Sequence, residues 1–155
     1  MWNKKLSLWL SVTVCFLCTL WLTVGLFAGP WAAKVWFTVF RGFSPDGEAL
    51  ARMIALFKWC FYPCAVFAYI TLYSLLRLLF NIKKDDVFVV ANAVYLRRIS
   101  WCCLAVAAIT FIGGLWYLPF LFVAFAAAFV GLLLRVVKNV MQSAAEIKAE
   151  NELTI

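Results

Sequence analysis

Histidine is absent from this chain of 155 residues, and acidic side chains are scarce, with 7 Asp and Glu against 14 Lys and Arg. The absence of histidine removes the commonest general base, metal ligand and haem ligand at once. The sequence also lacks a glycine-rich phosphate loop and a nucleophile accompanied by a base. We therefore expect no catalytic residues, no metal site and no cofactor, and we predict that the chain is not an enzyme.

Charged residues of any kind make up only 14% of the chain, whereas 67% of its residues are apolar. An ordinary soluble domain is roughly 45–50% apolar and about 25% charged, so one water-facing core would not hide this much apolar surface. The 15 Phe, 8 Trp and 5 Tyr exclude a disordered chain, which would be poor in aromatic residues. The composition predicts a small integral membrane protein.

Four long apolar runs predict an all-α, four-helix membrane bundle that forms a single domain. The first run would be about 34 Å long as a helix, which is enough to cross a hydrocarbon core of about 30 Å. It is too long for the apolar region of a secretory signal, so we interpret it as a retained anchor. The expected spans are residues 6–28, 54–80, 99–113 and 115–134, followed by a tail over 135–155. Gly113, Gly114 and Pro119 supply the turn between the last two spans.

Lys and Arg are distributed unevenly between the two ends that such a bundle would present to water. The end that would hold both termini carries Lys4, Lys5, Arg77, Lys83, Lys84, Arg97, Arg98, Arg135, Lys138 and Lys148, and the other end carries Lys34, Arg41, Arg52 and Lys58. Cytoplasmic segments of membrane proteins carry the excess of positive charge. The distribution therefore predicts a protein of the cell membrane with both termini and the middle loop in the cytoplasm, and it assigns the charge to the membrane rather than to nucleic acid.

The predicted spans contain no Asp or Glu, whereas proton and ion pathways usually need carboxylates inside the membrane. This absence disfavours a transporter that acts alone. Four small residues of the last span lie at i, i+3, i+4 and i+7, on one helical face that allows close helix approach. These residues are Ala124, Ala127, Ala128 and Gly131. We expect this face to pack within the chain, because four helices can satisfy one another, and a homo-oligomer is the alternative.

The six cysteines lie inside apolar runs, where we expect them to pack as small hydrophobic side chains. Cys15 and Cys18 have the spacing of a redox or metal pair, and Cys60 and Cys64 lie one helical turn apart. Thiol exchange in the membrane is therefore an alternative function. The expected depth of these residues argues against it, because no cysteine lies in the outer loop to relay electrons.

The segment between the first two spans, residues 29–48, is itself apolar. Lys34 and Arg41 are surrounded there by Trp31, Val35, Trp36, Phe37, Val39, Phe40 and Phe43. We expect this segment to lie in the plane of the lipid headgroups or to fold over the helix ends. An alternative is a receiving surface for a peptide or lipid, because exposed apolar area rimmed by charge often marks a contact site. The chain would then be an immunity protein or an accessory transport subunit.

The loop between the second and third spans predicts a helix that runs along the inner membrane surface. Asp85 or Asp86 suits the N-cap position, and the apolar and polar residues that follow Phe88 have helical spacing. Arg97 and Arg98 would then lie at the depth of the lipid phosphates. The chain ends in an acidic stretch whose size suits helix-in-groove binding or capture of a terminal carboxylate.

These two stretches together resemble a family of small bacterial membrane proteins, domain of unknown function two-nine-seven-five. In that family a motif of an aromatic residue, three residues, Asn, and then Leu-Arg-x-Ile precedes the third span, and the terminus is close to Glu-Asn-Asp-Leu-Thr-Ile. The matching residues here are Phe88, Asn92, Leu96, Arg97 and Ile99, and then Glu150, Asn151, Glu152, Leu153, Thr154 and Ile155. The sequence departs from the pattern at Val87, where a Pro commonly precedes the aromatic residue.

The resemblance implies a four-span fold. Because such proteins are often encoded beside a small helix-turn-helix regulator, it also implies that the membrane protein binds or restrains that regulator. The expected function is therefore a membrane regulatory or scaffold protein whose inner-surface helix and acidic tail bind a cytoplasmic partner. The expected contact residues are Phe88, Asn92, Leu96, Arg97, Glu150, Asn151, Glu152, Leu153, Thr154 and Ile155.

Overall fold

The computed structural model describes residues 4–44, 47–83 and 90–153, and these residues form four long α-helices. Helix α1 spans Lys4–Arg41, α2 spans Glu48–Lys83, α3 spans Val90–Gly114 and α4 spans Pro119–Leu153. All four contain a segment that is long and apolar enough to cross a membrane. The prediction of an all-α, four-span chain is confirmed, and the chain is a multi-pass membrane protein.

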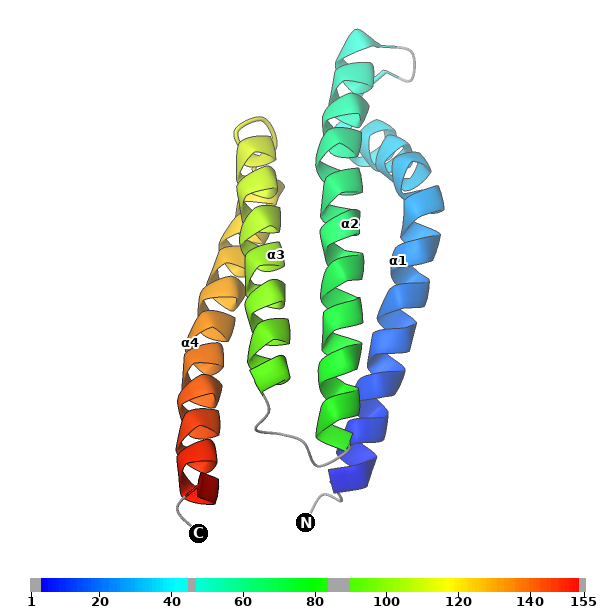
Figure 1. The fold of residues 1–155 in the computed structure, drawn as a ribbon. Coiled ribbons are helices and arrows are strands. Elements are labelled where there is room, and N and C mark those ends of the chain that lie inside the picture. The colour runs from blue at the N-terminus through cyan, green and yellow to red at the C-terminus, as the bar shows by residue number, and fades with distance from the viewer. Residues whose placement is uncertain (1–3, 45–46, 84–89, 154–155) are drawn as a thin grey trace.

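The four helices run alternately along one axis, so the two chain termini lie at the same end of the molecule (Figure 1). We call this the terminal end, and it also holds the last turn of α2 and the first turn of α3. The opposite end, which we call the hairpin end, holds the last turn of α3 and the first turns of α2 and α4. The helices pack mainly in chain order, and the α3–α4 contact is the most extensive.

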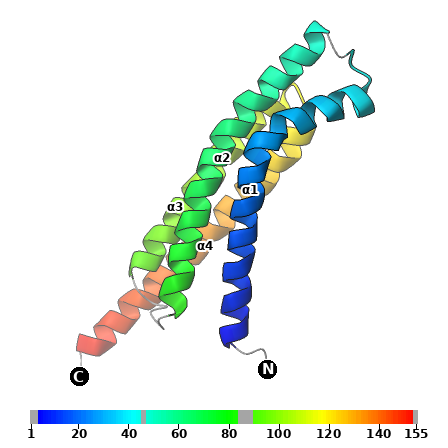
Figure 2. The ribbon, with the colours of Figure 1, turned by 90° about the vertical axis from the view of Figure 1, so that its right-hand side faces the viewer.

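Helix α1 extends well beyond the predicted first span. With 38 residues it is about 57 Å long, so it cannot lie entirely within a hydrocarbon core of about 30 Å. Pro30 lies inside the helix, where it removes one backbone hydrogen bond and bends the axis, as Figure 2 shows. Because α1 continues past this bend to Arg41, the segment 31–41, which was predicted to be part of a loop, is helical. Gly42 ends the helix with a φ of 67°, a conformation that glycine adopts without strain.

The bent part of α1 packs over the hairpin end. Ala33 and Phe37 are buried there together with Leu50 of α2. The ring of Phe37 contacts the ring of Tyr117, between α3 and α4, with a centroid distance of 5.6 Å. Arg41 lies over the same tyrosine ring at 5.6 Å. This arrangement agrees with the expectation that the outer segment folds over the helix ends.

Glycine residues allow the close approach of α1 to α2. A Cβ atom at Gly29 would lie 3.2 Å from the ring of Phe61, and one at Gly25 would lie 3.9 Å from the same ring. A hydrogen bond of 2.9 Å joins the hydroxyl groups of Thr23 and Tyr69 nearby. The spacing Gly25-x-x-x-Gly29 is a known signal for helix packing in membranes, and the sequence analysis missed it.

The small-residue face of α4 packs against α3 within the chain. Ala124 and Gly131 are buried, and a Cβ atom at Gly131 would lie 3.2 Å from Leu104. The Ser100 hydroxyl donates a hydrogen bond of 2.7 Å to the Gly131 carbonyl oxygen. This bond joins the two helices at a point of close approach, which Gly131 allows because it has no Cβ atom. The expectation that this face packs within the chain agrees with these contacts.

Candidate functional site

Asn92, the polar residue at the centre of the predicted contact motif, lies inside the protein. Its side chain is fully buried, and its Oδ1 atom accepts a hydrogen bond of 2.9 Å from Nδ2 of Asn81. Asn81 lies in the last turn of α2, and Asn92 lies in the first turn of α3. The pair therefore joins the two helices at the terminal end.

The other motif residues are divided between the interior and the surface. Leu96 and Ile99 are each 5% exposed, and with Asn92 they follow the spacing i, i+4, i+7 along the buried face of α3. Arg97 and the adjacent Arg98 are exposed. Phe88 lies outside the described residues. Of the described motif residues, Arg97 is thus the one that a partner can reach.

The predicted tail is a continuation of α4. The helix runs to Leu153, and both Glu146 and Glu150 are exposed near its end. Glu146 accepts a hydrogen bond of 3.2 Å from the amide of Gln142. Among the other predicted contact residues, Thr154 and Ile155 lie outside the described residues, as do the side chains of Asn151, Glu152 and Leu153.

This last part of α4 projects beyond α3, its partner in the hairpin, as Figure 1 shows. Ser100 and Gly131 lie at the same level, and α4 continues twelve residues further from that level than α3 does. The projection is therefore about 18 Å long. Val140 and Ile147 are 65% and 59% exposed, so the projecting helix and the turns before it carry apolar as well as acidic side chains.

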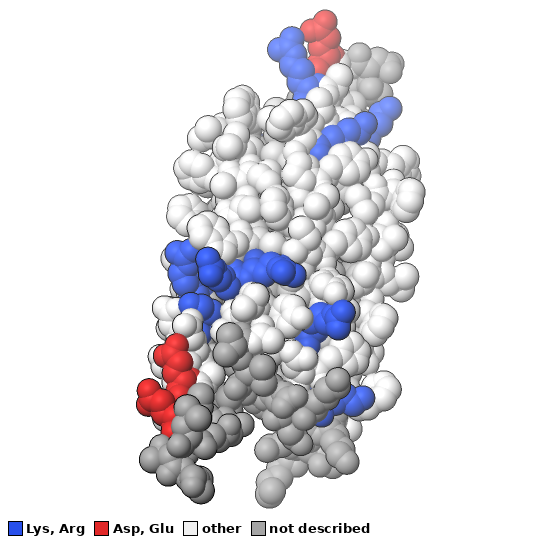
Figure 3. Space-filling view, viewed as in Figure 1, with Lys and Arg blue, Asp and Glu red and all other residues white. Residues whose placement is uncertain are grey.

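Basic side chains form a second feature of the terminal half of the molecule. Figure 3 shows Lys and Arg side chains gathered in a band on the α3–α4 side. The guanidinium group of Arg135 lies over the ring of Trp101, 5.0 Å from its centroid, and Trp101 is 56% exposed. Lys138 lies one turn further along α4 and donates a hydrogen bond of 3.2 Å to Asn139. We call Arg97, Arg98, Arg135 and Lys138 the basic cluster.

In the described parts of the chain, no ion pair joins the basic cluster to an acidic side chain. The ion pair found there, Arg52 with Glu48, lies in the first turns of α2 at the hairpin end. Between the charges at that end and the band on α3 and α4, the surface in Figure 3 is free of charged side chains. This is the surface expected of a protein whose middle lies in hydrocarbon and whose charges lie at the two interfaces.

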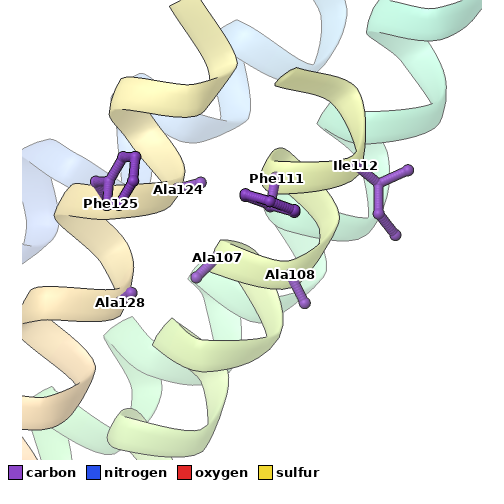
Figure 4. A pocket seen from close by; sticks show the side chains of 7 residues that line it. All are labelled: Ala107, Ala108, Phe111, Ile112, Ala124, Phe125 and Ala128. Carbon is purple, nitrogen blue, oxygen red and sulfur yellow. The ribbon is translucent and has the colours of Figure 1, made fainter. Parts of the chain in front are cut away.

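A shallow groove of about 390 Å³ lies between α3 and α4, in the half of the molecule nearer the hairpin end. Figure 4 shows the side chains that line it. The lining residues are Ala107, Ala108, Phe111, Ile112, Ala124, Phe125 and Ala128. Because small alanine side chains of both helices meet there, the groove reaches close to the contact between the helices, and its wall is apolar.

The cysteines are all free thiols, and they are spread over α1, α2 and α3. Cys60 packs beside Gly113, where a Cβ atom would lie 2.6 Å from its Sγ atom. Within residues 4–44, 47–83 and 90–153, no three metal-binding side chains gather into one group. The thiol of Cys60 therefore fills space against the α3–α4 turn.

Comparison with protein families gives one match, to the family described as "Protein of unknown function (DUF2975)", over residues 6–155. The chain belongs to this family. The DUF2975 match includes all four helices, so the resemblance drawn from the Asn92 motif and the acidic terminus is confirmed. Comparison with curated proteins and with solved structures gives no match.

Two features of this DUF2975 protein were missed in the sequence analysis. The contact between Arg135 and Trp101 joins residues 34 positions apart, and the packing of α3 against α4 brings them together. The burial of Asn92 was also missed, because a polar residue near a helix start is commonly exposed. A polar residue at i, i+4, i+7 spacing with Leu96 and Ile99 was the available signal, since those residues define the buried face.

Proposed function

We propose that this DUF2975 protein is a membrane scaffold that binds a soluble cytoplasmic protein at its terminal end, through the projecting part of α4. The observation that carries the proposal is the exposure of Glu146 and Glu150 on a helix segment that projects about 18 Å beyond α3. Exposed Ile147 lies between these two carboxylates. An amphipathic, acidic helix end of this kind suits a partner with an apolar groove and a basic rim.

The partner that we propose is a small helix-turn-helix regulator, because such a protein carries a basic surface for DNA phosphates. Occupation of that surface by the acidic end of α4 would exclude DNA, so membrane binding and DNA binding would compete. The membrane protein itself would need no contact with nucleic acid. Both termini would then lie in the cytoplasm, as the distribution of Lys and Arg indicates.

We propose a binding role rather than catalysis. The buried hydroxyl groups of Ser74, Ser100 and Thr110 donate hydrogen bonds to backbone carbonyl groups, with distances of 2.7–2.8 Å. The hydroxyl groups of Ser74 and Thr110 bond to carbonyl groups of their own helices, and that of Ser100 bonds across the α3–α4 contact. The buried amide of Asn92 joins α2 to α3. Ser100 and Asn92 thus join neighbouring helices, whereas Ser74 and Thr110 do not. This supports a structural use of these buried polar groups.

A capture experiment tests the proposed contact. The full chain and the Glu146→Gln/Glu150→Gln variant are compared for recovery of a purified small helix-turn-helix regulator, the class of partner that we propose. We expect the variant to recover about ten-fold less, because two charge contacts of up to about 1 kcal/mol each are lost. Recovery by the full chain should also fall as salt is added.

The matched control is Asn139→Lys/Ser143→Lys, which raises the net charge of the same helix equally and keeps both carboxylates. Asn139 and Ser143 are exposed, so neither variant disturbs the packing of α4. The control should keep most of the recovery. Equal recovery by the full chain and the Glu146→Gln/Glu150→Gln variant would show that the end of α4 does not bind the partner.

A further inference from the structure

We propose that the α3–α4 face holds one anionic phospholipid, with its phosphate group at the basic cluster and an acyl chain in the apolar groove. The proposal is independent of the proposed protein partner, because it uses the basic cluster and the groove rather than Glu146, Ile147 and Glu150. It rests on the positions of unpaired cations, an exposed tryptophan and a groove on one helix pair. The ligand class is a lipid with a net negative headgroup.

The cations and the groove lie on the same face of α3. Trp101, Ala108 and Ile112 are spaced i, i+7 and i+11, so they follow one stripe along the helix. Arg97 lies one turn before Trp101, and Arg98 lies three residues before it. Trp101 is therefore flanked by the two arginines on one side and by the groove residues on the other.

The same alignment occurs on α4. Ala124 and Ala128 line the groove, and Arg135 follows at the spacing i, i+4, i+11. The contact of Arg135 with Trp101 shows that the two stripes face each other across the helix pair. The cations at the terminal half and the groove toward the hairpin end thus form one continuous surface on α3 and α4.

The distances fit one leaflet of a bilayer. Ala108 lies about 10 Å and Ile112 about 16 Å along α3 from Trp101, as the helical rise gives. Half of a hydrocarbon core of about 30 Å is about 15 Å, so an acyl chain whose headgroup lies beside Trp101 reaches the groove. Tryptophan is typical of this interfacial depth.

Charge decides which lipid is held. In the described part of the chain, no acidic side chain lies within ion-pair distance of Arg97, Arg98, Arg135 or Lys138. Four cations at phosphate depth favour a headgroup that keeps a net negative charge over a zwitterionic one, in which a cationic amine opposes them. Arginine also offers two parallel donors to phosphate oxygens.

Lipid binding to the purified full chain in a neutral detergent, followed by native mass spectrometry, tests the proposal. Phosphatidylglycerol, phosphatidylcholine with the same acyl chains, and inorganic phosphate are compared. We expect phosphatidylglycerol to bind at least ten-fold more tightly than phosphatidylcholine, and inorganic phosphate not to displace it at equal concentration. Equal binding of the two lipids would overturn the proposal, and displacement by phosphate would overturn the lipid as the ligand.

Variants locate the site. The Arg97→Gln/Arg98→Gln variant should bind phosphatidylglycerol about 25-fold more weakly, or about five-fold for each cation removed. The control Lys34→Gln/Lys58→Gln removes two exposed cations from the hairpin half. It should leave binding within about two-fold, because the distance from these lysines to the basic cluster exceeds the length over which salt screens charges. An equal loss in the control would show a general charge effect and overturn the site.

A bulky residue in the groove provides a test that leaves all charges in place. Ala108→Trp fills the groove from the exposed side, whereas Ala126→Trp places the same residue on the exposed opposite face of α4. We expect Ala108→Trp alone to weaken the binding of long-chain phosphatidylglycerol, by about five-fold or more, because apolar contact along the acyl chain is lost. Unchanged binding in Ala108→Trp would remove the groove from the site.

Discussion

The Gly113→Ala variant is expected to unfold more readily than the unaltered chain, by about 1–3 kcal/mol, which is the usual cost of an added methyl group in a well-packed core. The added Cβ atom would lie 2.6 Å from the Sγ atom of Cys60 and 3.2 Å from the ring of Phe120. A contact under 3 Å between such atoms requires a shift of either the Cys60 side chain or one of the two helices. Gly113 lies in the last turn of α3, so a shift of that helix would move the α3–α4 hairpin away from α2.

Removal of the Cys60 sulfur atom should relieve this clash. In a Gly113→Ala/Cys60→Ala double variant the sulfur atom is absent, and we expect at least half of the lost stability to return. Cys60→Ala alone is the control and should cost less than the glycine substitution, since it removes one atom. Denaturant titration of the purified chain in detergent gives the free energies of unfolding. Strictly additive effects of the two substitutions would contradict the close contact of α2 with this turn.

Loss of the Asn92 side chain is the second change with a large expected effect. Asn92→Ala should lower the free energy of unfolding by about 1–3 kcal/mol, because it removes a fully buried amide and leaves the half-buried Asn81 amide without this hydrogen bond. Adding Asn81→Ala to this variant should cost much less than Asn81→Ala does in the unaltered chain. The coupling energy of the two residues is therefore expected to be about 0.5–3 kcal/mol.

Arg97→Gln is the control for this cycle, because Arg97 is in the same motif but is exposed. Its effect on stability should remain within about 0.5 kcal/mol. A coupling energy near zero between Asn81 and Asn92, together with lost capture of the cytoplasmic partner by Asn92→Ala, would instead assign Asn92 to a binding surface. The two readouts thus separate a structural role of the motif from a contact role.

The sequence was sufficient to predict features that depend on one segment alone, and insufficient for features that depend on packing between helices. The apolar runs predicted four spans because hydrocarbon length is a property of each segment alone. Residues 31–41 are helical because α1 continues through Pro30 and Phe37 packs over the hairpin end. The packing of Phe37 is a tertiary contact. Hydropathy alone therefore assigned that segment to a loop.

The candidate sites were predictable to a smaller extent. The family resemblance identified Asn92, Leu96 and Arg97 as one motif. The helical spacing places the first two on one face and Arg97 on another, but only the contact of α3 with α2 shows which face is buried. The basic cluster combines residues of α3 and α4, and its assembly depends on the packing of α3 against α4. Such packing is set by side chains that are distant in the sequence, so periodicity within one helix could not reveal it.

The orientation of the terminal end is the central claim, and accessibility of single cysteines to a membrane-impermeant maleimide tests it most directly. Ile147→Cys and Lys34→Cys are made in a chain whose six native cysteines are replaced by alanine, and both positions are exposed. If the terminal end is cytoplasmic, intact cells will label Lys34→Cys, and Ile147→Cys will react only after the membrane is permeabilised. Labelling of Ile147→Cys in intact cells, with Lys34→Cys protected, would place the end of α4 outside the cell and contradict the proposed cytoplasmic partner.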